Sequence, residues 1–427
     1  LMTKIIAVSN QKGGVGKTTT SVNLAASLGV LEKKVLLIDA DPQANATSSL
    51  GVDTESVESG TYQVLEHTKE ITDCIQKTDV PNLDIIPSHI DLVAIEIELV
   101  DTAEREYMLK KAISKCNLDY DYIIIDCAPS LGLITLNALT AATSVIIPIQ
   151  CEYLALEGLV KLLNTIKNIQ KIHNSNLEIE GMLLTMYDSR LKLANQIVAE
   201  VNNHFGDMVF KTIIQRNVKL GEAPSYGESI INYDVGSKGA EDYLSLAREL
   251  ISKNKILSDI DLLLNNKQLK LKQDNTLLDE ITGLVEFPNV MLGTIDNEFM
   301  SLPPEVLSTA MRVHQKYFTI FDNKKKLAPK FIFVSNALSE KNRNIRITEG
   351  NQRVLRARLS DASFFWKVDT SNSLDHFNKK LKKVLFYDGL GSIFDKTIRL
   401  AKISDFFASF FNLDPFFSKR SCSFVKS

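Results

Sequence analysis

Apolar runs alternate with amphipathic stretches through the first 254 positions. A short apolar run at 4–9 ends in the polar residue Asn10, and a glycine-rich turn follows it. Residues 18–28 then have helical spacing, with Gly29 as a stop signal. This order predicts a strand, a loop and a helix.

The same alternation continues along this part of the chain, with helical stretches between most of the apolar runs. Further buried strands are predicted at 35–38, 122–125, 145–149, 179–185 and 212–214. Continuous apolar strands that alternate with helices are typical of a mostly parallel sheet covered on both faces. We therefore predict a doubly wound α/β fold, in which a ligand binds beyond the carboxyl ends of the strands.

The pattern changes after residue 254. Residues 255–280 are polar with leucines at helical spacing, which predicts a solvated helix or a linker. Residues 281–403 are expected to form a smaller α+β or mainly helical region, and residues 404–427 are an atypical phenylalanine-rich tail. The domain division predicted from the sequence is thus 1–254, 255–280, 281–403 and 404–427.

Charge and aromatic content break at the same place. Residues 1–254 carry 22 basic and 33 acidic residues, whereas residues 255–427 carry 27 and 19, although the whole chain has a net charge of only -3. Eighteen of the 20 phenylalanines and the single tryptophan follow residue 254. These two breaks lead us to expect that two sequences of different origin are joined in this chain.

The glycine-rich turn has the residues of a phosphate-binding loop. It reads Lys12-Gly13-Gly14-Val15-Gly16-Lys17-Thr18. Glycines let successive N–H groups point at phosphate oxygens, and the following helix adds its positive amino end. Lys17 would neutralise the β and γ phosphates, while the Thr18 hydroxyl would bind Mg²⁺. The usual first glycine of this pattern is Gln11 here, and a second lysine, Lys12, stands beside it.

Acidic residues follow two of the predicted strands. Asp39 and Asp41 come after the run at 35–38, and Asp126 comes after the run at 122–125. All three carboxylates would emerge on the nucleotide side, one to orient Mg²⁺ and another to orient the attacking water. Glycine-rich turns and acids at strand ends are common and usually only solvated. The combination with two lysines and a threonine between strand and helix favours nucleotide binding.

These residues resemble the ParA (Soj) partition ATPases, which have a deviant Walker A loop. The resemblance covers about residues 4–254. It rests on Asn10-Gln11-Lys12-Gly13-Gly14-Val15-Gly16-Lys17-Thr18-Thr19-Thr20, Asp39-Ala40-Asp41-Pro42-Gln43, Ile125-Asp126-Cys127-Ala128-Pro129-Ser130-Leu131-Gly132, Pro148-Ile149-Gln150-Cys151-Glu152-Tyr153 and Glu222-Ala223-Pro224-Ser225.

The resemblance implies an ATPase in which ATP is held between the two subunits of a homodimer. Lys12 would then reach the phosphates of the partner, and a cation placed there is stabilising only while the γ-phosphate is present. The implied catalytic residues are Lys12, Lys17 and Asp41, of which Asp41 would activate water. The implied ligands of the nucleotide are Lys12, Gly13, Gly14, Val15, Gly16, Lys17, Thr18 and Thr19 at the phosphates and Met186, Arg216 and Asn217 at the base. Thr18 and Asp126 would hold Mg²⁺, partly through water. Near the implied base contacts, the family usually has proline at the position of Gln215.

The same resemblance implies sequence-independent DNA binding by the dimer. The acidic composition of residues 1–254 argues against such binding, since a basic patch is its usual electrostatic footprint. Arg190 and Lys219 nevertheless match the basic positions of the family, and they would contact phosphates without reading bases. The expected function is partition of a chromosome or plasmid, with a ParB-type centromere-binding protein that stimulates turnover.

The cellular compartment follows from two further features. No apolar run approaches the ~20 residues that cross a bilayer. The five cysteines are an odd number without a Cys-x-x-Cys pair, which fits a reducing compartment. We therefore expect a cytoplasmic protein without a membrane partner, associated with the nucleoid through its DNA binding.

The second part resembles an internal portion of the bacterial glycyl-tRNA synthetase β subunit over about residues 255–403. The matching segments are 285–288, 302–307, 314–318, 351–359 and 361–366. Arg353, Arg356 and Arg358 beside His314 and Tyr317 suit the phosphates and unstacked bases of tRNA, although core packing explains the aromatic residues equally well.

The aromatic residues of segment 361–366 are interpreted as part of a core. Phe364, Phe365 and Trp366 have helical spacing, so we expect them to be buried against neighbouring elements and not presented to RNA. A fragment of this size cannot be a complete glycine–tRNA ligase, because in that family the main chemistry belongs to a separate α subunit.

Three hypotheses follow for the whole chain. The first is a partition ATPase that works as a nucleotide-switched, DNA-binding dimer. The second is a tRNA-binding or glycine–tRNA ligase accessory protein whose function resides in the second half. The third is that residues 255–427 are a passenger joined by gene fusion, and we favour the first and third together.

Overall fold

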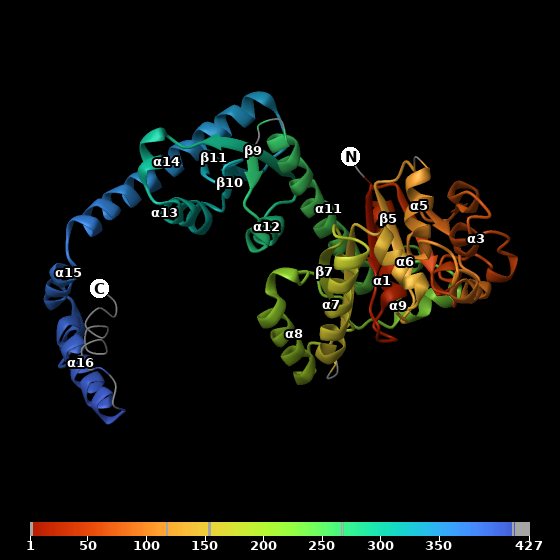
Figure 1. Ribbon diagram of the computed structural model, residues 1–427, viewed down its shortest axis with the longest axis horizontal. Helices are drawn as coiled ribbons and strands as arrows, with labels where there is room; N and C mark the ends of the chain where they lie inside the picture. Colours follow the sequence, from red (N-terminus) through yellow and green to blue (C-terminus); the bar gives the residue numbers. More distant parts are fainter. Residues whose placement is uncertain are drawn as a thin grey trace. The chain divides into compact units, whose positions relative to one another are not determined.

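The computed structural model describes residues 3–116, 118–152, 155–265, 267, 269–411 and 414 (Figure 1). Tyr153 and the tail phenylalanines Phe416, Phe417 and Phe424 lie outside these residues. The chain forms two compact units. The first contains residues 1–266, 273–290 and 334–338, and the second contains 267–272, 291–333 and 339–427.

A seven-stranded sheet is the centre of the first unit. Its strand order is β3-β4-β2-β5-β1-β6-β7, and every neighbouring pair is parallel except β3 with β4. The strands are β1 (Lys4–Val8), β2 (Val35–Ala40), β3 (Gln76–Lys77), β4 (Leu83–Ile86), β5 (Tyr122–Cys127), β6 (Ser144–Gln150) and β7 (Glu178–Thr185). The predicted mostly parallel sheet is confirmed.

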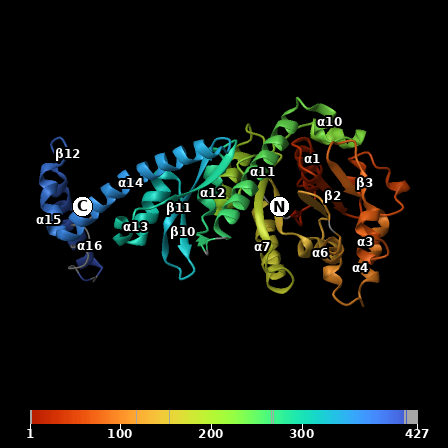
Figure 2. The same ribbon diagram turned by 90° about the horizontal axis from the view of Figure 1, so that it is seen from above.

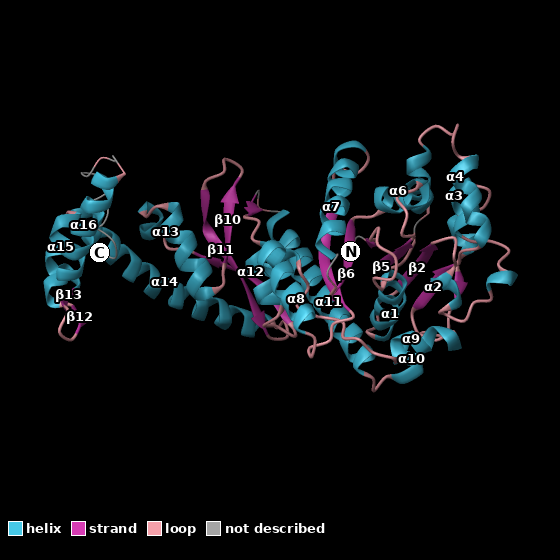
Figure 3. Cartoon of the chain, turned by 90° about the horizontal axis from the view of Figure 1, so that it is seen from below, coloured by secondary structure: helices cyan, strands magenta, loops and turns pink. Residues whose placement is uncertain are grey.

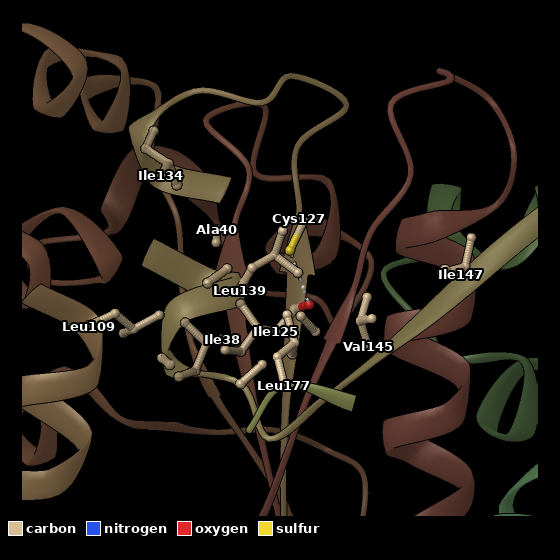
Figure 4. Close-up of a cluster of buried hydrophobic side chains, with 14 of the residues drawn as sticks. Ile38, Ala40, Leu109, Ile125, Cys127, Ile134, Leu139, Val145, Ile147 and Leu177 are labelled. Atoms are coloured by element: carbon tan, nitrogen blue, oxygen red, sulfur yellow. Dashed lines mark hydrogen bonds between the residues drawn. The ribbon is translucent and has the colours of Figure 1, made fainter. Parts of the chain in front are cut away.

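Both faces of this sheet are buried, which explains why its strands are continuous apolar runs. Successive residues of β5 point to opposite faces: Ile123 and Ile125 join one apolar cluster, while Tyr122 and Ile124 join the other. Figure 3 shows α3 and α6 on one side of β2 and β5, with α1 and α10 on the other. Figure 4 shows the first cluster, in which Leu109 and Leu139 from the helices surround Ile38 and Ile125.

The helices of this unit fall into two layers. Those on the side of the first cluster are α3 (Thr61–Glu66), α4 (Ile95–Glu98), α5 (Met108–Lys115), α6 (Leu133–Ala141), α7 (Ala155–Ile172) and α8 (Lys192–Phe205). Those on the other side are α1 (Lys17–Val30), α2 (Asn45–Ser48), α10 (Ile230–Asp234) and α11 (Lys238–Asn265), and α9 (Lys219–Glu222) precedes α10. Figure 2 shows α10 and α11 beside α1.

One predicted strand is wrong, and two strands, β3 and β4, were missed. The two residues of β3 are too few to show a pattern. Residues 212–214 do not form a strand. The Thr212 amide donates to the carboxylate of Glu249 (3.0 Å), only the Ile214 amide bonds β7, at the carbonyl of Leu184 (2.9 Å), and the isolated bridges lie outside the segment, at Val209 and Gln215. The strand β4 was not predicted, since Asp84 interrupts its apolar run. The Asp84 carboxylate is accommodated there by hydrogen bonds from Lys77 and Tyr120.

Helix α11 continues without a break across residue 254. Ile256, Ile260 and Leu264 in its last third are buried. The following helix α12 (Asn275–Thr282) belongs to the same compact unit and is held there by an ion pair of Lys253 with Asp279 (3.2 Å). Residues beyond 254 therefore contribute apolar side chains to the first unit.

The second unit contains helices around small antiparallel sheets, as the sequence predicted. One sheet has the order β8-β10-β11-β9, and a hairpin pairs β12 with β13. The elements are β8 (Leu269–Leu271), β9 (Pro288–Thr294), α13 (Pro304–Thr309), β10 (Phe318–Asp322), β11 (Leu327–Asn336), α14 (Lys341–Ser371), α15 (Leu374–Lys380), β12 (Leu385–Tyr387), β13 (Gly391–Ser392) and α16 (Ile393–Phe410). Its core gathers Tyr317, Phe331 and Phe333, with Leu355 and Leu359 from α14.

The expected burial of Phe364, Phe365 and Trp366 is wrong. All three side chains are exposed on the last half of α14. Leu359 is the last buried residue of this helix, so its remaining turns are not packed into a core. Phe406, Phe407, Phe410 and Phe411 near the end of α16 are also exposed. In the described part of the chain, no helix has the length and apolar content needed to span a membrane.

Candidate nucleotide-binding site

The predicted phosphate-binding loop connects β1 to the amino end of α1. Gly14 and Gly16 have φ angles of 72° and 86°, a conformation that residues with a Cβ atom rarely adopt. Gly16 also lies against the end of β7, since a Cβ atom at this position would be 4.0 Å from Cβ of Thr185 and 3.9 Å from Cε of Met186, the residue after the strand. The glycines therefore permit a turn that presents backbone N–H groups in front of α1, as an anion site requires.

Asn10 fixes the start of this loop. Its side-chain amide donates to the carbonyl oxygen of Pro148 in β6 (2.7 Å), and its Oδ1 accepts from the amide of Lys12 (3.0 Å). The loop is thereby attached to the neighbouring strand of the sheet as well as to its own. This attachment limits the positions that Lys12 can take.

The two lysines of the loop have different surroundings. Lys17 is buried with 7 % of its surface exposed, and its Nζ donates to the carbonyl oxygen of Lys12 (3.0 Å). Burial lowers the pKa of Lys17, although Asp126, Cys127 and Asp41 oppose the shift. The Lys12 side chain is only half-buried, and among the described residues its ammonium group has no ion pair. Lys12 is thus the lysine that remains available to a group outside this chain.

Two carboxylates lie side by side at the carboxyl ends of β2 and β5. Asp39 and Asp126 are direct partners in the register of these strands, and both are fully buried. Burial raises the pKa of each, and the hydrogen bonds of Asp39 only partly oppose its shift. Asp126 Oδ1 accepts a hydrogen bond from the Ser21 hydroxyl (2.7 Å), whereas Oδ2 has no partner among the described residues.

A buried acceptor without a partner fits a site for a hard cation. Asp126 Oδ2 supplies a carboxylate oxygen, and Thr18 in the first turn of α1 supplies a hydroxyl group. Oxygen ligands of this kind, completed by water and phosphate oxygens, are what Mg²⁺ uses in nucleotide sites. Ser21 was missed by the sequence analysis, although its position one turn after Lys17 could have indicated it.

Asp39 organises the segment that carries Asp41. Asp39 Oδ2 accepts from the backbone amide of Thr47 (2.8 Å) and from its hydroxyl (2.7 Å), while Oδ1 accepts from the amide of Asp41 (3.1 Å). The Thr47 hydroxyl in turn accepts from the amide of Ser88 (2.9 Å). Asp41 is therefore held on a fixed turn at the edge of the site, and Thr47 is a second contributor that the sequence did not indicate.

Two hydrogen-bonded loops carry the residues that the resemblance implies at the base. The Tyr187 amide donates to the carbonyl of Ile214 (3.1 Å), and the Arg216 amide donates to the carbonyl of Tyr187 (2.8 Å). These bonds bring Met186, Arg216 and Asn217 onto adjacent loops, as the proposed base contacts require. Met186 has a φ angle of 53°, an uncommon conformation for a residue with a Cβ atom, at the point where β7 leaves the sheet.

Gln215 stands where the family usually has proline, and its backbone amide makes a hydrogen bond. The Gln215 amide donates to the carboxylate of Asp242 (2.9 Å), a hydrogen bond that proline cannot make. The next residue, Arg216, forms an ion pair with Glu152 (3.7 Å). The loop that carries Arg216 and Asn217 is thus fixed by two acidic residues.

Arg190 and Lys219, the predicted DNA contacts, are each paired with an acidic residue. Arg190 donates to both oxygens of Asp188, from Nε (2.9 Å) and from Nη2 (2.7 Å). The Lys219 ammonium group forms an ion pair with Asp234. The hydrogen bonds from Arg190 lower the pKa of Asp188 to about 2, so this carboxylate is charged at neutral pH.

The residues expected to contact tRNA have different surroundings in the second unit. Arg356 is paired with Asp296, and the Tyr317 hydroxyl donates to Asn351 (2.6 Å) while its ring packs on Phe331. His314 and Arg358 line a groove of about 520 Å³. The aromatic part of the expected tRNA contact is therefore partly a core, which is one of the two interpretations that the sequence left open.

Comparison with protein families gives one match for each half of the chain. Residues 3–179 match the model of the AAA domain family, and residues 241–426 match the model of the glycyl-tRNA synthetase beta subunit. The second match begins before residue 255 and continues past residue 403, so it is longer than the sequence motifs indicated.

Individual relatives match the first half over nearly their whole length. Sporulation initiation inhibitor protein Soj of Bacillus subtilis is 57% identical over 249 residues, which is 58% of this chain and 98% of Soj. Chromosome partitioning protein ParA of Myxococcus xanthus is 50% identical over 251 residues, which is 59% of this chain and 89% of ParA. Among solved structures, cobyrinic acid a,c-diamide synthase of Mycobacterium smegmatis with bound ADP and magnesium is 39% identical with a TM-score of 0.53, over 60% of this chain and 96% of that one.

Proposed function

The chain belongs, through about its first 250 residues, to the Soj/ParA family of chromosome-partitioning ATPases, and on this premise we propose that it partitions DNA as an ATP-switched dimer. The observation that carries the proposal is the pair of lysines in one loop. Lys17 is buried and directed into its own loop, whereas Lys12 is half-buried with no ion pair in the described residues. This asymmetry supports one lysine acting within the subunit and the other acting across a dimer.

We propose that the loop binds the triphosphate of ATP. Backbone N–H groups of residues 13–19 and the amino end of α1 would contact the phosphate oxygens, and Lys17 would exchange its bond to the Lys12 carbonyl for the β and γ phosphates. Thr18 and Asp126 would hold Mg²⁺, which neutralises phosphate charge when it is bound. Asp41, fixed by the bond of its amide to Asp39, would orient and deprotonate the attacking water.

Dimerisation follows in this proposal from the γ-phosphate itself. Lys12 of each subunit would contact the phosphates held by its partner, so the interface gains a charge-assisted contact only while ATP is intact. Hydrolysis and loss of phosphate would remove that contact and release the dimer. Met186, Arg216 and Asn217 would contact the base, with Arg216 positioned by Glu152.

DNA binding and a protein partner complete the proposed cycle. Arg190 and Lys219 from both subunits would contact DNA phosphates without reading bases, which would place the protein on the nucleoid in the cytoplasm. Turnover would be stimulated by a ParB-type centromere-binding protein. Partition of a plasmid and partition of a chromosome require the same chemistry at this site.

The decisive experiment measures ATP hydrolysis and mass together. We expect the wild-type chain to hydrolyse ATP slowly and to sediment as a dimer with ATP and Mg²⁺, and as a monomer with ADP. Lys17→Ala should lose nucleotide binding and hydrolysis, whereas Lys12→Ala should retain nucleotide binding and fail to dimerise. Unchanged turnover in Lys17→Ala, or a chain that stays monomeric with ATP and Mg²⁺, would refute the proposal.

The second candidate function is tRNA binding by residues 255–427. It is favoured by the match of residues 241–426 to the glycyl-tRNA synthetase beta subunit model. We expect a gel-shift assay with unfractionated tRNA at low salt to decide it, since electrostatic contacts are strongest there. Equal tRNA binding by the full chain and by an Arg353→Ala, Arg358→Ala double variant would contradict this function, as would no binding at all.

A further inference from the structure

The two proposed DNA contacts share one arrangement of charges. Each basic side chain is exposed and lies against a carboxylate that is less exposed: 86% against 13% for Arg190 and Asp188, and 49% against 27% for Lys219 and Asp234. In each ion pair the basic side chain is therefore the one that faces solvent. At each contact a carboxylate directly opposes the basic group. Glu222 adds a second negative charge near Lys219, and Arg216 adds a second positive charge near Asp188.

The carboxylates are fixed by the backbone as well as by their basic partners. Asp188 Oδ1 accepts from the backbone amide of Arg190 (3.0 Å). Asp234 Oδ1 accepts from the backbone amide of Gly236 (3.0 Å), while its other oxygen faces Lys219. Since these acids are held on their own turns, an approaching phosphate meets a carboxylate that does not move aside.

We propose that Asp188 and Asp234 are built-in competitors for the phosphates of DNA, and that they keep the affinity of this surface low. The inference rests on the proposed function of Arg190 and Lys219 as DNA contacts. A phosphate must share or displace a carboxylate at each contact, so each basic residue neutralises less phosphate charge than an unpaired one would. The same pairing removes the positive patch that usually marks a DNA-binding surface.

A low affinity set in this way has a functional consequence. Nonspecific binding through phosphates is almost entirely electrostatic, so its strength follows the number of effective positive charges. A subunit with two masked cations binds weakly alone, and two subunits present four such contacts to one DNA. The dimer therefore binds DNA more tightly than a single subunit does, although each individual contact is unchanged.

The test is DNA binding by the full chain with ATP and Mg²⁺, measured by fluorescence anisotropy on a labelled duplex of arbitrary sequence over a range of salt. Asp188→Asn and Asp234→Asn should each tighten binding about two- to fivefold, the size expected for one exposed ion pair. The slope of log affinity against log salt should become steeper, by up to about 0.9 for each phosphate newly neutralised. A purely structural role for these acids would not steepen that slope.

Asp119→Asn is the matched control. Asp119 forms an exposed ion pair with Lys34 at the amino ends of β2 and β5, whereas Asp188 follows the carboxyl end of β7. Loss of Asp119 changes the net charge equally. The double variant Asp188→Asn, Arg190→Ala should lose the gain of Asp188→Asn. The wild type could bind DNA while Asp188→Asn and Asp234→Asn bind it no more tightly than Asp119→Asn does. That result would overturn this inference and leave the proposed function standing. Failure of the wild type to bind DNA would instead refute the proposed function.

Discussion

The hydroxyl of Thr185 donates a hydrogen bond to the backbone carbonyl oxygen of Val15, 2.9 Å away. This bond joins the last residue of β7 to the phosphate-binding loop, although 170 positions separate them in the chain. Met186, the next residue, lies against Gly16 of the same loop. The proposed base contacts and the proposed phosphate contacts are therefore parts of one hydrogen-bonded structure.

Thr185→Val tests this connection, because it removes the hydroxyl and keeps the shape of the side chain. Loss of one buried hydrogen bond, worth about 1 kcal/mol, should weaken ATP binding about fivefold. A fluorescent ATP analogue titrated against the full chain measures the effect. Thr68→Val is the control, since the Thr68 hydroxyl bonds an exposed glutamate far along the chain from the loop. Equal affinities of the two variants would contradict the connection.

Asp41→Asn should separate binding from hydrolysis. The amide side chain keeps the size of Asp41 and the bond of its backbone amide to Asp39, but it cannot accept a proton from water. We expect ATP binding within about twofold of the wild type and hydrolysis reduced at least about 100-fold, the usual contribution of a general base. Single-turnover hydrolysis measures this, with Asp91→Asn on an exposed turn as the control. Hydrolysis at the wild-type rate would exclude Asp41 as the base.

Asp126 should make the stability of the nucleotide-free chain depend on pH. Burial, and then the nearby charge of Asp39, raises the pKa of Asp126, so the folded chain holds a proton that the unfolded chain has released. The stability that this proton contributes is fully present below the pKa of aspartate in the unfolded chain, near 3.9. It is lost as the pH rises through the pKa of Asp126 in the folded chain. Asp126→Asn has no such group, so its Tm should rise relative to the wild type between pH 5 and pH 8.5.

Thermal unfolding in EDTA measures that difference. Excess Mg²⁺ and ATP should reduce the pH dependence of the wild type, since a bound cation stabilises the charged carboxylate. A difference in Tm between Asp126→Asn and the wild type that is constant over this pH range would show that Asp126 does not titrate in the way its burial predicts.

Truncation tests whether residues beyond 254 are a passenger. A chain that ends at 254 lacks the buried side chains Ile256, Ile260 and Leu264, whereas one that ends at 290 keeps them and α12. Each buried aliphatic side chain contributes about 1.5 to 3 kcal/mol. We therefore expect the shorter chain to unfold several degrees lower, as measured by calorimetry. Equal Tm values would support a passenger that begins at 255.

The sequence predicted those parts of the fold that depend on local patterns. Buried strands appear as apolar runs, so the sheet could be predicted, and the acids at two strand ends placed Asp39 and Asp126 at one edge. The partners of small hydroxyl groups could not be predicted in the same way. Ser21 contacts a residue 105 positions away, and Thr47 contacts Asp39 through a turn whose path is set only when the strands pair.

The sequence pattern also could not predict which charged residues form ion pairs or which helix faces are exposed. Arg190 and Lys219 could be identified as basic positions, but their pairing with Asp188 and Asp234 depends on the path of two loops. The helical spacing of Phe364 and Trp366 indicated a face of α14 without indicating whether another element covers it. In the described chain no element does.

Helix α11 passes through residue 254 without a break, and Leu250 and Ile256 are buried on either side of the join. A protease needs an extended, accessible segment to cleave, and a helix packed in this way offers none at the join. We therefore expect no proteolytic cleavage at residue 254 while α11 is folded. Both halves should be synthesised, retained and degraded as a single unit, whatever the second half does.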